Sequence, residues 1–299
     1  MSYLCLLVAF AVQKKSQTKD FTRTFTVGCP RLAETYFFIR LLFYTHSFVN
    51  VLPKFAYCLF QTINWLKYNE ASGVPSLSKA TIEKIKVRVP SMDEQGKLSN
   101  QLFLLDKRIE VQNKIIEKLE TLIKGIIETV ISSQKPNTFI KNCLECDSST
   151  LQESQVAENG AYPVYGATGI SGYTETADVN GEAILITKDG SGVGTVKFAD
   201  GEYSYIGTLN RLIAREGYCL KYLYFALQGF CFEPYKTGMA IPHIYFKDYG
   251  KAKIFCPTIE EQSIIAKSLS VIENKISVEK QILFCNQLQK SYLLSQMLI

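Results

Sequence analysis

Apolar residues between positions 98 and 130 recur at alternating steps of four and three residues. The positions of this run are Leu98, Leu102, Leu105, Ile109, Gln112, Ile116, Leu119, Ile123, Ile126 and Val130. All but one are apolar, and a heptad kept for more than four repeats is typical of a coiled-coil helix. We therefore predict a long helix over about residues 91–132.

The same spacing returns near the C-terminus and predicts a second long helix over about residues 258–298. It is strong from Ile265 to Leu283, weakens at Asn286 and Lys290, and recovers at Leu293. Two such helices in one chain most simply pack on each other, and we expect them to run antiparallel. The predicted interface comprises Leu102, Leu105, Ile109, Ile116, Leu119, Leu269, Ile272, Ile276 and Leu283.

Two polar residues, Gln112 and Glu279, occupy the same step of the two heptad patterns. A buried polar residue in a coiled coil can fix the register of the helices. The alternative is that both side chains lie on a solvated rim. The pattern leaves both interpretations open.

The chain also contains an internal repeat with one constant offset, the distance along the chain from Pro90 to Pro257. It joins Ser72–Gln95 to the segment around Thr237–Gln262 without a gap. Each copy consists of a small-residue turn, a short alternating strand (Ile85, Val87 and Val89 in the first copy), a proline and an acidic helix start. The matching pairs are Pro75 with Pro242, Lys84 with Lys251, Lys86 with Lys253, Pro90 with Pro257, Glu94 with Glu261 and Gln95 with Gln262.

The segment between the helices, residues 136–257, has the pattern of a β-rich domain. Glycines at 166, 169 and 172 indicate tight turns between short strands. Further strands are expected over residues 183–187, 195–198 and 202–206, and a helix over 220–227. The glycine-rich turn Lys188–Gly194 lacks the Gly-Lys-Ser/Thr and the helix of a P-loop, so we interpret it as a loop whose backbone approaches a ligand such as a phosphate closely.

Composition narrows the class of protein. The net charge of +5 permits nucleic-acid binding without requiring it, and nine scattered cysteines fit a reducing cytosol. The apolar run at residues 1–12 is too short to span a bilayer and predicts a buried strand. Cys143 and Cys146 form a C-x-x-C pair with no matching second pair, so we expect two ordinary buried thiols and no metal site.

No constellation of residues in the sequence predicts catalysis. The chain has only two histidines, His46 and His243, and it lacks the G-x-S-x-G and H-E-x-x-H motifs. We therefore expect a non-catalytic protein without a cofactor, located in the cytoplasm.

Several of these motifs together resemble the specificity subunits of type I restriction-modification enzymes. Tyr162–Gly166, the Lys188–Gly194 turn, Gly238–Pro242, Ile254–Pro257 and Glu260–Gln262 resemble one target-recognition domain, and Ser72–Lys79 with Val89–Gln95 resembles the end of another. The resemblance covers about residues 65–299. It implies that each recognition domain reads one half of a split sequence in double-stranded DNA, while a coiled coil of two helices sets the gap. It also implies methyltransferase subunits and a motor-nuclease subunit as partners, and no membrane association.

The expected fold class is α+β, with two β-rich target-recognition domains separated by two long helices that pair as an antiparallel coiled coil. The second domain spans about 120 residues before its helix, whereas the first spans about 90 and shows no counterpart of the Lys188–Gly194 turn. We therefore expect a truncated first recognition domain. The expected ranges are 1–90 for the partial first recognition domain, 91–135 for the central helix, 136–257 for the second recognition domain and 258–299 for the C-terminal helix.

Contacts to DNA phosphates come mostly from basic side chains, hydroxyls and backbone amides. Tyr165 and His243 lie in the motif loops and are expected to face base edges or sugars, although Tyr165 equally suits a core aromatic. Each lysine also suits a solvated surface position. The phosphate-contact candidates are Lys188, Ser191, Lys197, Arg211, Lys236 and Lys247 in the second domain, and Lys67 and Lys79 in the first.

Three alternatives to an active specificity subunit follow from the same patterns. The first is a non-catalytic coiled-coil scaffold with lectin-like or protein-binding modules, which the repeat alone permits. The second is a silent, truncated recombination cassette of such a subunit. The third, a stand-alone nuclease or methylase, is disfavoured by the missing catalytic motifs.

Overall fold

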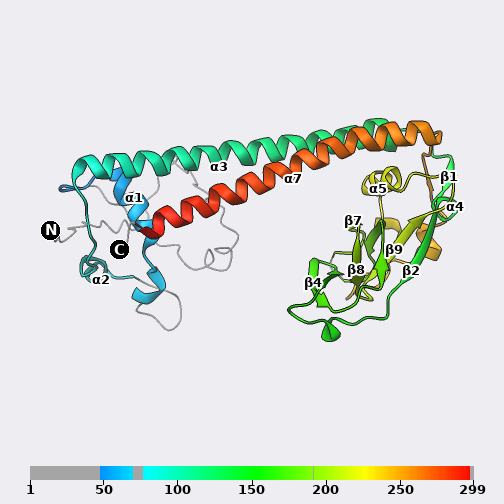
Figure 1. Ribbon diagram of the computed structural model, residues 1–299, viewed down its shortest axis with the longest axis horizontal. Coiled ribbons are helices and arrows are strands. Elements are labelled where there is room, and N and C mark those ends of the chain that lie inside the picture. Colours follow the sequence, from blue (N-terminus) through cyan, green and yellow to red (C-terminus); the bar gives the residue numbers. More distant parts are fainter. Residues whose placement is uncertain (1–47, 70–76, 191, 297–299) are drawn as a thin grey trace, which may run out of the picture. The chain divides into compact units, whose positions relative to one another are not determined.

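Two helices of more than thirty residues dominate the helical part of the computed structural model (Figure 1). They are α3 (Met92–Ile126) and α7 (Ile259–Gln296). The structure describes residues 48–69, 77–190 and 192–296. It divides into two units, one formed by residues 1–113 and 281–299 and the other by residues 114–280.

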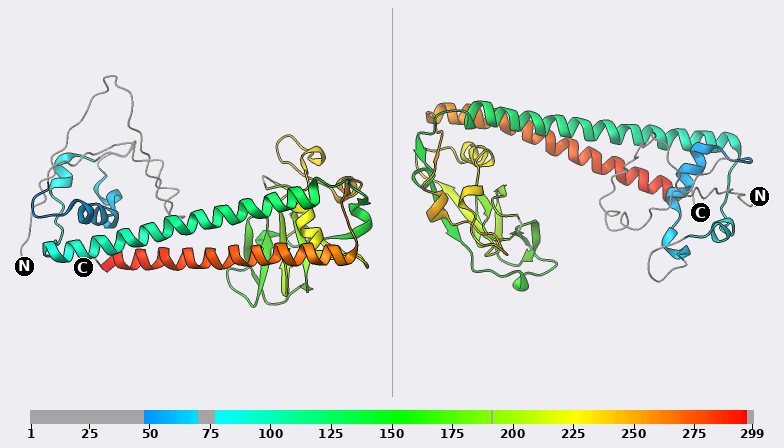
Figure 2. Two further views of the ribbon diagram at one scale, coloured as in Figure 1. Left: turned by 90° about the horizontal axis from the view of Figure 1, so that it is seen from above. Right: turned by 180° about the vertical axis from the view of Figure 1, so that it is seen from behind.

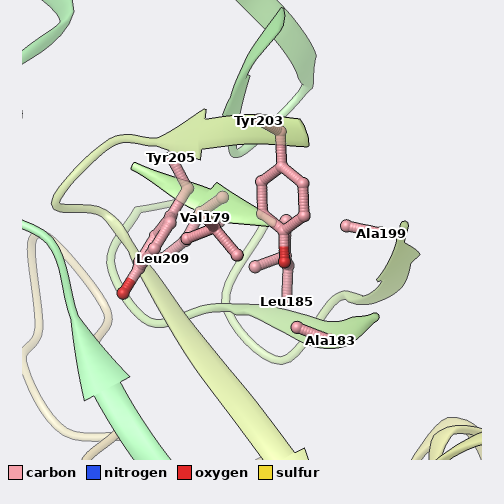
Figure 3. Packing of buried hydrophobic residues seen from close by; sticks show 7 residues of the cluster. All are labelled: Val179, Ala183, Leu185, Ala199, Tyr203, Tyr205 and Leu209. Carbon is pink, nitrogen blue, oxygen red and sulfur yellow. The ribbon is translucent and has the colours of Figure 1, made fainter. Parts of the chain in front are cut away.

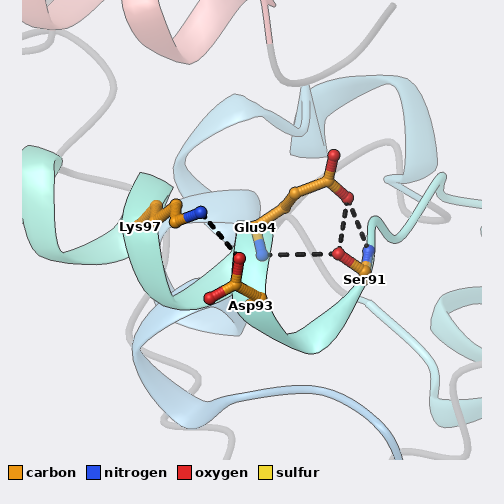
Figure 4. Close-up of polar contacts among 4 residues, drawn as sticks. All are labelled: Ser91, Asp93, Glu94 and Lys97. Carbon is orange, nitrogen blue, oxygen red and sulfur yellow. Dashed lines mark hydrogen bonds and ion pairs between the residues drawn. The ribbon is translucent and has the colours of Figure 1, made fainter.

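Both long helices begin with the same reciprocal cap. Ser91 donates its amide and hydroxyl to Glu94 Oε2, at 3.0 and 2.7 Å, which lowers the pKa of that carboxyl (Figure 4). Thr258 makes the same pair of contacts to Glu261, at 3.1 and 3.3 Å. A Ser/Thr-x-x-Glu capping box satisfies amides that have no partner within the helix, so both helices start directly after the proline of each repeat.

The repeat extends further towards the N-terminus than the sequence motifs indicated. Helix α1 (Pro53–Thr62) precedes α5 (Leu220–Gln228) by the same offset that separates Pro90 from Pro257. Helix α2 (Lys79–Glu83) precedes α6 (Phe246–Tyr249) by that offset as well. The first unit therefore carries the same order of helices as the end of the second. The predicted strand at residues 1–12 lies outside the described residues.

The second unit contains two four-stranded sheets and one short strand pair. The first sheet, in the order β2-β9-β6-β7, is antiparallel; the second, in the order β4-β3-β8-β5, contains one parallel pair, β3 with β8. Strand β1 pairs with β10, and short α4 (Ile140–Cys143) follows β1. The strands are β1 (Thr138–Phe139), β2 (Leu144–Ser148), β3 (Tyr162–Gly166), β4 (Gly169–Thr174), β5 (Val179–Asn180), β6 (Ala183–Thr187), β7 (Val196–Ala199), β8 (Glu202–Tyr205), β9 (Leu209–Ala214) and β10 (Lys253–Ile254).

The core of this unit joins residues from both sheets. Leu185 of β6 and Tyr203 of β8 belong to one buried cluster (Figure 3). Helix α5 packs against β7, β6 and β9. Short 3-10 turns at Glu153–Gln155 and Glu233–Tyr235 complete the unit.

A smaller core in the first unit forms around α1. Phe55, Ala56 and Leu59 are buried there together with Val51. The partly buried residues that pack against this core include Leu98 of α3. A 3-10 turn at Trp65–Tyr68 follows α1.

The alternating strand predicted at residues 85–89 is wrong in extent. Only Val87 makes a β-bridge in this segment. Val87 and Val89 instead pack against the core around α1, so burial against a helix accounts for their alternation.

The heptad of α3 also departs from the prediction at its C-terminal end. The last turns, Ile127–Ser132, form a π-helix in which Ile127 and Ile131 are buried, while Val130 is exposed. A π-turn contains more residues than an α-turn, so it moves the apolar stripe by one position. The strict 4-3 spacing therefore ends after Ile123.

Candidate nucleic-acid interface

Two motif loops of the second unit are held together by backbone hydrogen bonds. The Gly190 amide donates to the Pro242 carbonyl at 3.0 Å, and the Ile244 amide donates to the Lys188 carbonyl at 2.9 Å. The glycine-rich turn after β6 therefore lies against the loop Thr237–His243. Because backbone bonds fix both segments, they present one preorganised surface.

The loop Thr237–His243 is closed at its base and apolar at its tip. Thr237 and His243 exchange backbone hydrogen bonds of 2.9 and 2.8 Å. Gly238 has a φ of +89°, and a Cβ there would lie 2.3 Å from the Ile241 carbonyl oxygen, so only glycine fits this turn. Met239 is 106% exposed and Ile241 is 63% exposed.

Two of the predicted phosphate contacts, Lys197 and Arg211, flank Leu185 on the two neighbouring strands. Lys197 of β7 and Arg211 of β9 both pair in register with Leu185 of β6, so their side chains leave the sheet on the face of the buried cluster. Lys197 donates to the Ala167 carbonyl at 2.9 Å, and burial lowers the pKa of its ammonium group. Arg211 donates to Asp147 at 2.8 Å.

The other basic candidates differ in how far they are already engaged. Lys236 forms an ion pair with Glu233, three residues earlier. Lys188 is half-buried next to the loop. Lys247 is exposed, and its ammonium group lies 5.1 Å from the centre of the Tyr245 ring.

A sequence model of the type I restriction modification DNA specificity domain matches residues 34–121 and 143–284, which is more than half of the chain. The chain belongs to this family. It is a DNA-target specificity subunit of a type I restriction-modification system. Members of the family bind DNA and assemble with other subunits of the system, and specificity subunits are generally non-catalytic.

Solved structures from type I restriction-modification systems have a similar fold. The S subunit of a type I restriction-modification system from M. genitalium matches with a TM-score of 0.64 and 16% identity, covering 84% of this chain and 73% of that chain. A chain from a study of complex assembly and conformational transition of the type I system matches with a TM-score of 0.50 and 15% identity, covering 83% and 71%. At these identities the likeness concerns the fold alone. No curated protein matches the sequence.

The specificity domain brings only part of the predicted DNA-contacting set together. Lys188 is bonded through its carbonyl to the residue after the loop Thr237–His243, Lys236 directly precedes this loop, and His243 ends it. Lys247 lies in α6, and Lys197 and Arg211 lie on the sheet face with the core. Ser191 lies outside the described residues. In the first unit Lys67 is exposed in the turn after α1, and Lys79 begins α2.

The two predicted base or sugar contacts have structural roles within the domain. The Tyr165 ring packs edge-on against Tyr203, with 5.4 Å between ring centres, next to the buried cluster. The backbone of His243 closes the loop, and its ring lies 5.8 Å from the Tyr245 ring. Tyr165 is thus placed as a core aromatic, and DNA contact by either residue stays a prediction.

The sequence patterns did not select Met239 and Ile241, two large apolar residues that are exposed at the loop tip. Both lie inside the motif Gly238–Pro242, but a search for basic and hydroxyl side chains does not select apolar ones. Apolar side chains of DNA-binding proteins can pack against thymine methyl groups or wedge between base steps. The exposure of Met239 and Ile241, which marks them as candidate contacts, is visible only in the folded loop.

The cysteines of the C-x-x-C pair differ in burial. Cys143 is fully buried, whereas Cys146 is half-buried, so the expectation of two buried thiols is correct for the first alone. Burial raises the pKa of the Cys146 thiol to about 11. Within the described ranges, no group of three or more potential ligands could hold a metal ion. Of the helices that the structure describes, none combines the length and the apolar character needed to cross a membrane.

Proposed function

We propose that this chain reads a two-part sequence in double-stranded DNA and directs methyltransferase and motor-nuclease subunits to it in the cytoplasm, without catalysing either reaction itself. The observation that carries the proposal is the structural repeat. Helices α1 and α2 recur as α5 and α6 at one offset, each set followed by a capped long helix. Two copies of the same set of helices are expected if each copy belongs to a domain that binds one half-site.

The proposed arrangement has two recognition domains, residues 1–90 and 136–257, and two long helices, residues 91–135 and 258–299, that pair as an antiparallel coiled coil. Two ion pairs join α7 to α3. In the second unit Lys280 Nζ lies 2.7 Å from Glu120 Oε1, and in the first unit Lys290 Nζ lies 2.6 Å from Asp106 Oδ1. The later of the two α7 residues, Lys290, pairs with the earlier of the two α3 residues, Asp106. This order supports an antiparallel direction of the helices. Within each unit the segments of α3 and α7 run alongside each other, as the left view of Figure 2 shows.

The polar positions of the two heptads support a role in fixing the register. Gln112 and Glu279 are 7% and 6% exposed, so the solvated-rim interpretation is wrong. Glu279 also pairs with Lys275 at 2.5 Å. A buried polar residue disfavours other registers because a shift would leave it opposite apolar side chains.

We further propose that the loop Thr237–His243 and the turn after β6 form the DNA-contacting surface of the second domain. The loop supplies apolar contacts through Met239 and Ile241, and Lys188 and Lys247 supply phosphate contacts beside it. Lys236 joins them when its ion pair with Glu233 opens. Lys197 and Arg211 are the weaker candidates, because their side chains are engaged on the core side of the sheet.

The test of this function is binding by the full chain together with its methyltransferase subunits. We expect tight binding to the bipartite target, weaker binding to scrambled duplex, and affinity for both that falls with salt at a log–log slope of about −0.9 per neutralised phosphate. The purified chain alone should transfer no methyl groups and cut no DNA. Salt-insensitive binding without sequence preference would contradict the proposal, as would turnover that persists after contaminating subunits are removed.

A further inference from the structure

A buried glutamine at the start of α7 joins that helix to the recognition domain. Gln262 is 2% exposed. Its amide group donates to the Pro257 carbonyl at 2.9 Å, and its carbonyl oxygen accepts from the Cys219 amide at 3.0 Å. Cys219 is the residue directly before α5, so Gln262 ties the first turns of α5 and α7 together.

A second contact joins the same two helices three turns further along α7. Glu273 accepts a hydrogen bond from the Tyr224 hydroxyl at 2.7 Å and pairs with the Lys221 ammonium at 2.8 Å. The Lys221 ammonium also lies 3.9 Å from the centre of the Phe198 ring on β7. Since α5 packs directly on the sheet, these contacts connect α7 to the body of the domain at two separate points.

The first of these two points recurs in the first repeat. Gln95 is 1% exposed, donates to the Pro90 carbonyl at 3.0 Å and accepts from the Leu52 amide at 2.8 Å. Asp106 stands where the second repeat has Glu273, but it pairs with Lys290 of α7. The glutamine joint, the pair of hydrogen bonds made by Gln95 or Gln262, therefore belongs to both repeats.

We infer that Gln262 and Glu273 are positioning residues that fix the angle between the second recognition domain and α7, and thereby the number of base pairs accepted between the two half-sites. The inference rests on the proposed bipartite function. A single joint leaves a hinge, whereas two joints three helical turns apart oppose rotation. A domain of about 100 residues has a radius of gyration of about 13 Å, so a rotation of about 15° moves a point at that distance from the pivot by one base-pair rise of about 3.4 Å.

The test uses the full chain with its methyltransferase subunits and duplexes whose gap is the natural one, one base pair shorter or one base pair longer. The natural target is first taken from methylome sequencing of a host that carries the unaltered system. Glu273→Ala should reduce the preference for the natural gap by about tenfold, the factor expected for the loss of a hydrogen bond to a charged group. Gln262→Ala should act in the same direction, and the half-site sequences should not change.

Matched substitutions on the same helix separate positioning from general damage. Glu260 and Gln281 are exposed on α7, and alanine at either position should leave the gap preference unaltered. Glu273→Gln, which keeps the acceptor for Tyr224 but loses the charge, should restore part of the preference. Should Gln262→Ala fail to fold, the two Glu273 variants, at a partly exposed position, still decide the question.

The outcomes separate this inference from the function on which it rests. An unchanged gap preference in folded Glu273→Ala, or a change in the half-site sequences, overturns the positioning role while the bipartite function stands. Failure of the unaltered complex to distinguish any gap length contradicts the bipartite function itself.

Discussion

Side chains that look available for DNA in the sequence are, at several positions, already engaged within the fold. Arg211 pairs with Asp147, Lys236 pairs with Glu233 and Lys197 donates to a carbonyl. Sequence alone gives the type of residue a phosphate contact needs, but not the carboxylate next to it in space. Asp147 is distant from Arg211 along the chain and lies opposite it only because β2 pairs with β9.

Lys236 allows a direct test at this scale, because its partner can be altered separately. Lys236→Ala should weaken binding to target and scrambled duplex alike and reduce the steepness of the log–log salt dependence by about 0.9. Glu233→Gln should strengthen binding to both duplexes, because it leaves the lysine without its competing carboxylate. Fluorescence anisotropy over a range of salt concentrations measures both effects.

Lys267 on α7 provides the control for that experiment. It is exposed and outside the proposed surface, so Lys267→Ala should leave the salt slope unchanged. If Lys236→Ala altered the preference between sequences but not the slope, Lys236 would be a base contact and not a phosphate contact.

At the level of elements, the hydrophobic pattern predicted a helix or strand correctly where its residues are both buried and suited to that conformation. Strand β6 occupies the predicted residues 183–187, and α5 exceeds its predicted range by one residue. Strand β2 was not predicted, because Leu144–Ser148 is mostly polar and is a strand only through its pairing with β9. Helix α1 was not predicted, although Lys54, Tyr57 and Gln61 match Lys221, Tyr224 and Gln228 of α5 at the offset of the repeat.

The heptad seam provides the clearest prediction for an element. Ile116 of α3 is 7% exposed, whereas its neighbour Ile115 is 37% exposed. Ile116→Asp should lower the free energy of unfolding by about 3 kcal/mol or more, because it places an unpaired charge in an apolar seam. Ile115→Asp has the same helix-propensity cost and should lower it by about 0.5 kcal/mol. Urea denaturation followed by circular dichroism compares the two, and equal losses would mean that Ile116 does not face α7.

For the whole molecule, the internal repeat was the most informative feature of the sequence, and the structure extends it. The motifs matched from Ser72 onwards, while the structure adds Leu52 and Cys219 as equivalent donors to Gln95 and Gln262. That equivalence depends on backbone hydrogen bonds, which do not constrain residue type and so leave little trace in the sequence. Family membership and the repeat together support a subunit that reads two half-sites.

Exchange of the second recognition domain tests this account most directly. Residues 136–257 are replaced by the corresponding segment of another specificity subunit, and the methylome of a host carrying the chimaera and its methyltransferase partner is sequenced beside that of the unaltered system. The account predicts a changed sequence on one side of the gap, with the other half-site and the gap length retained. A change in both half-sites, or in neither, would contradict it.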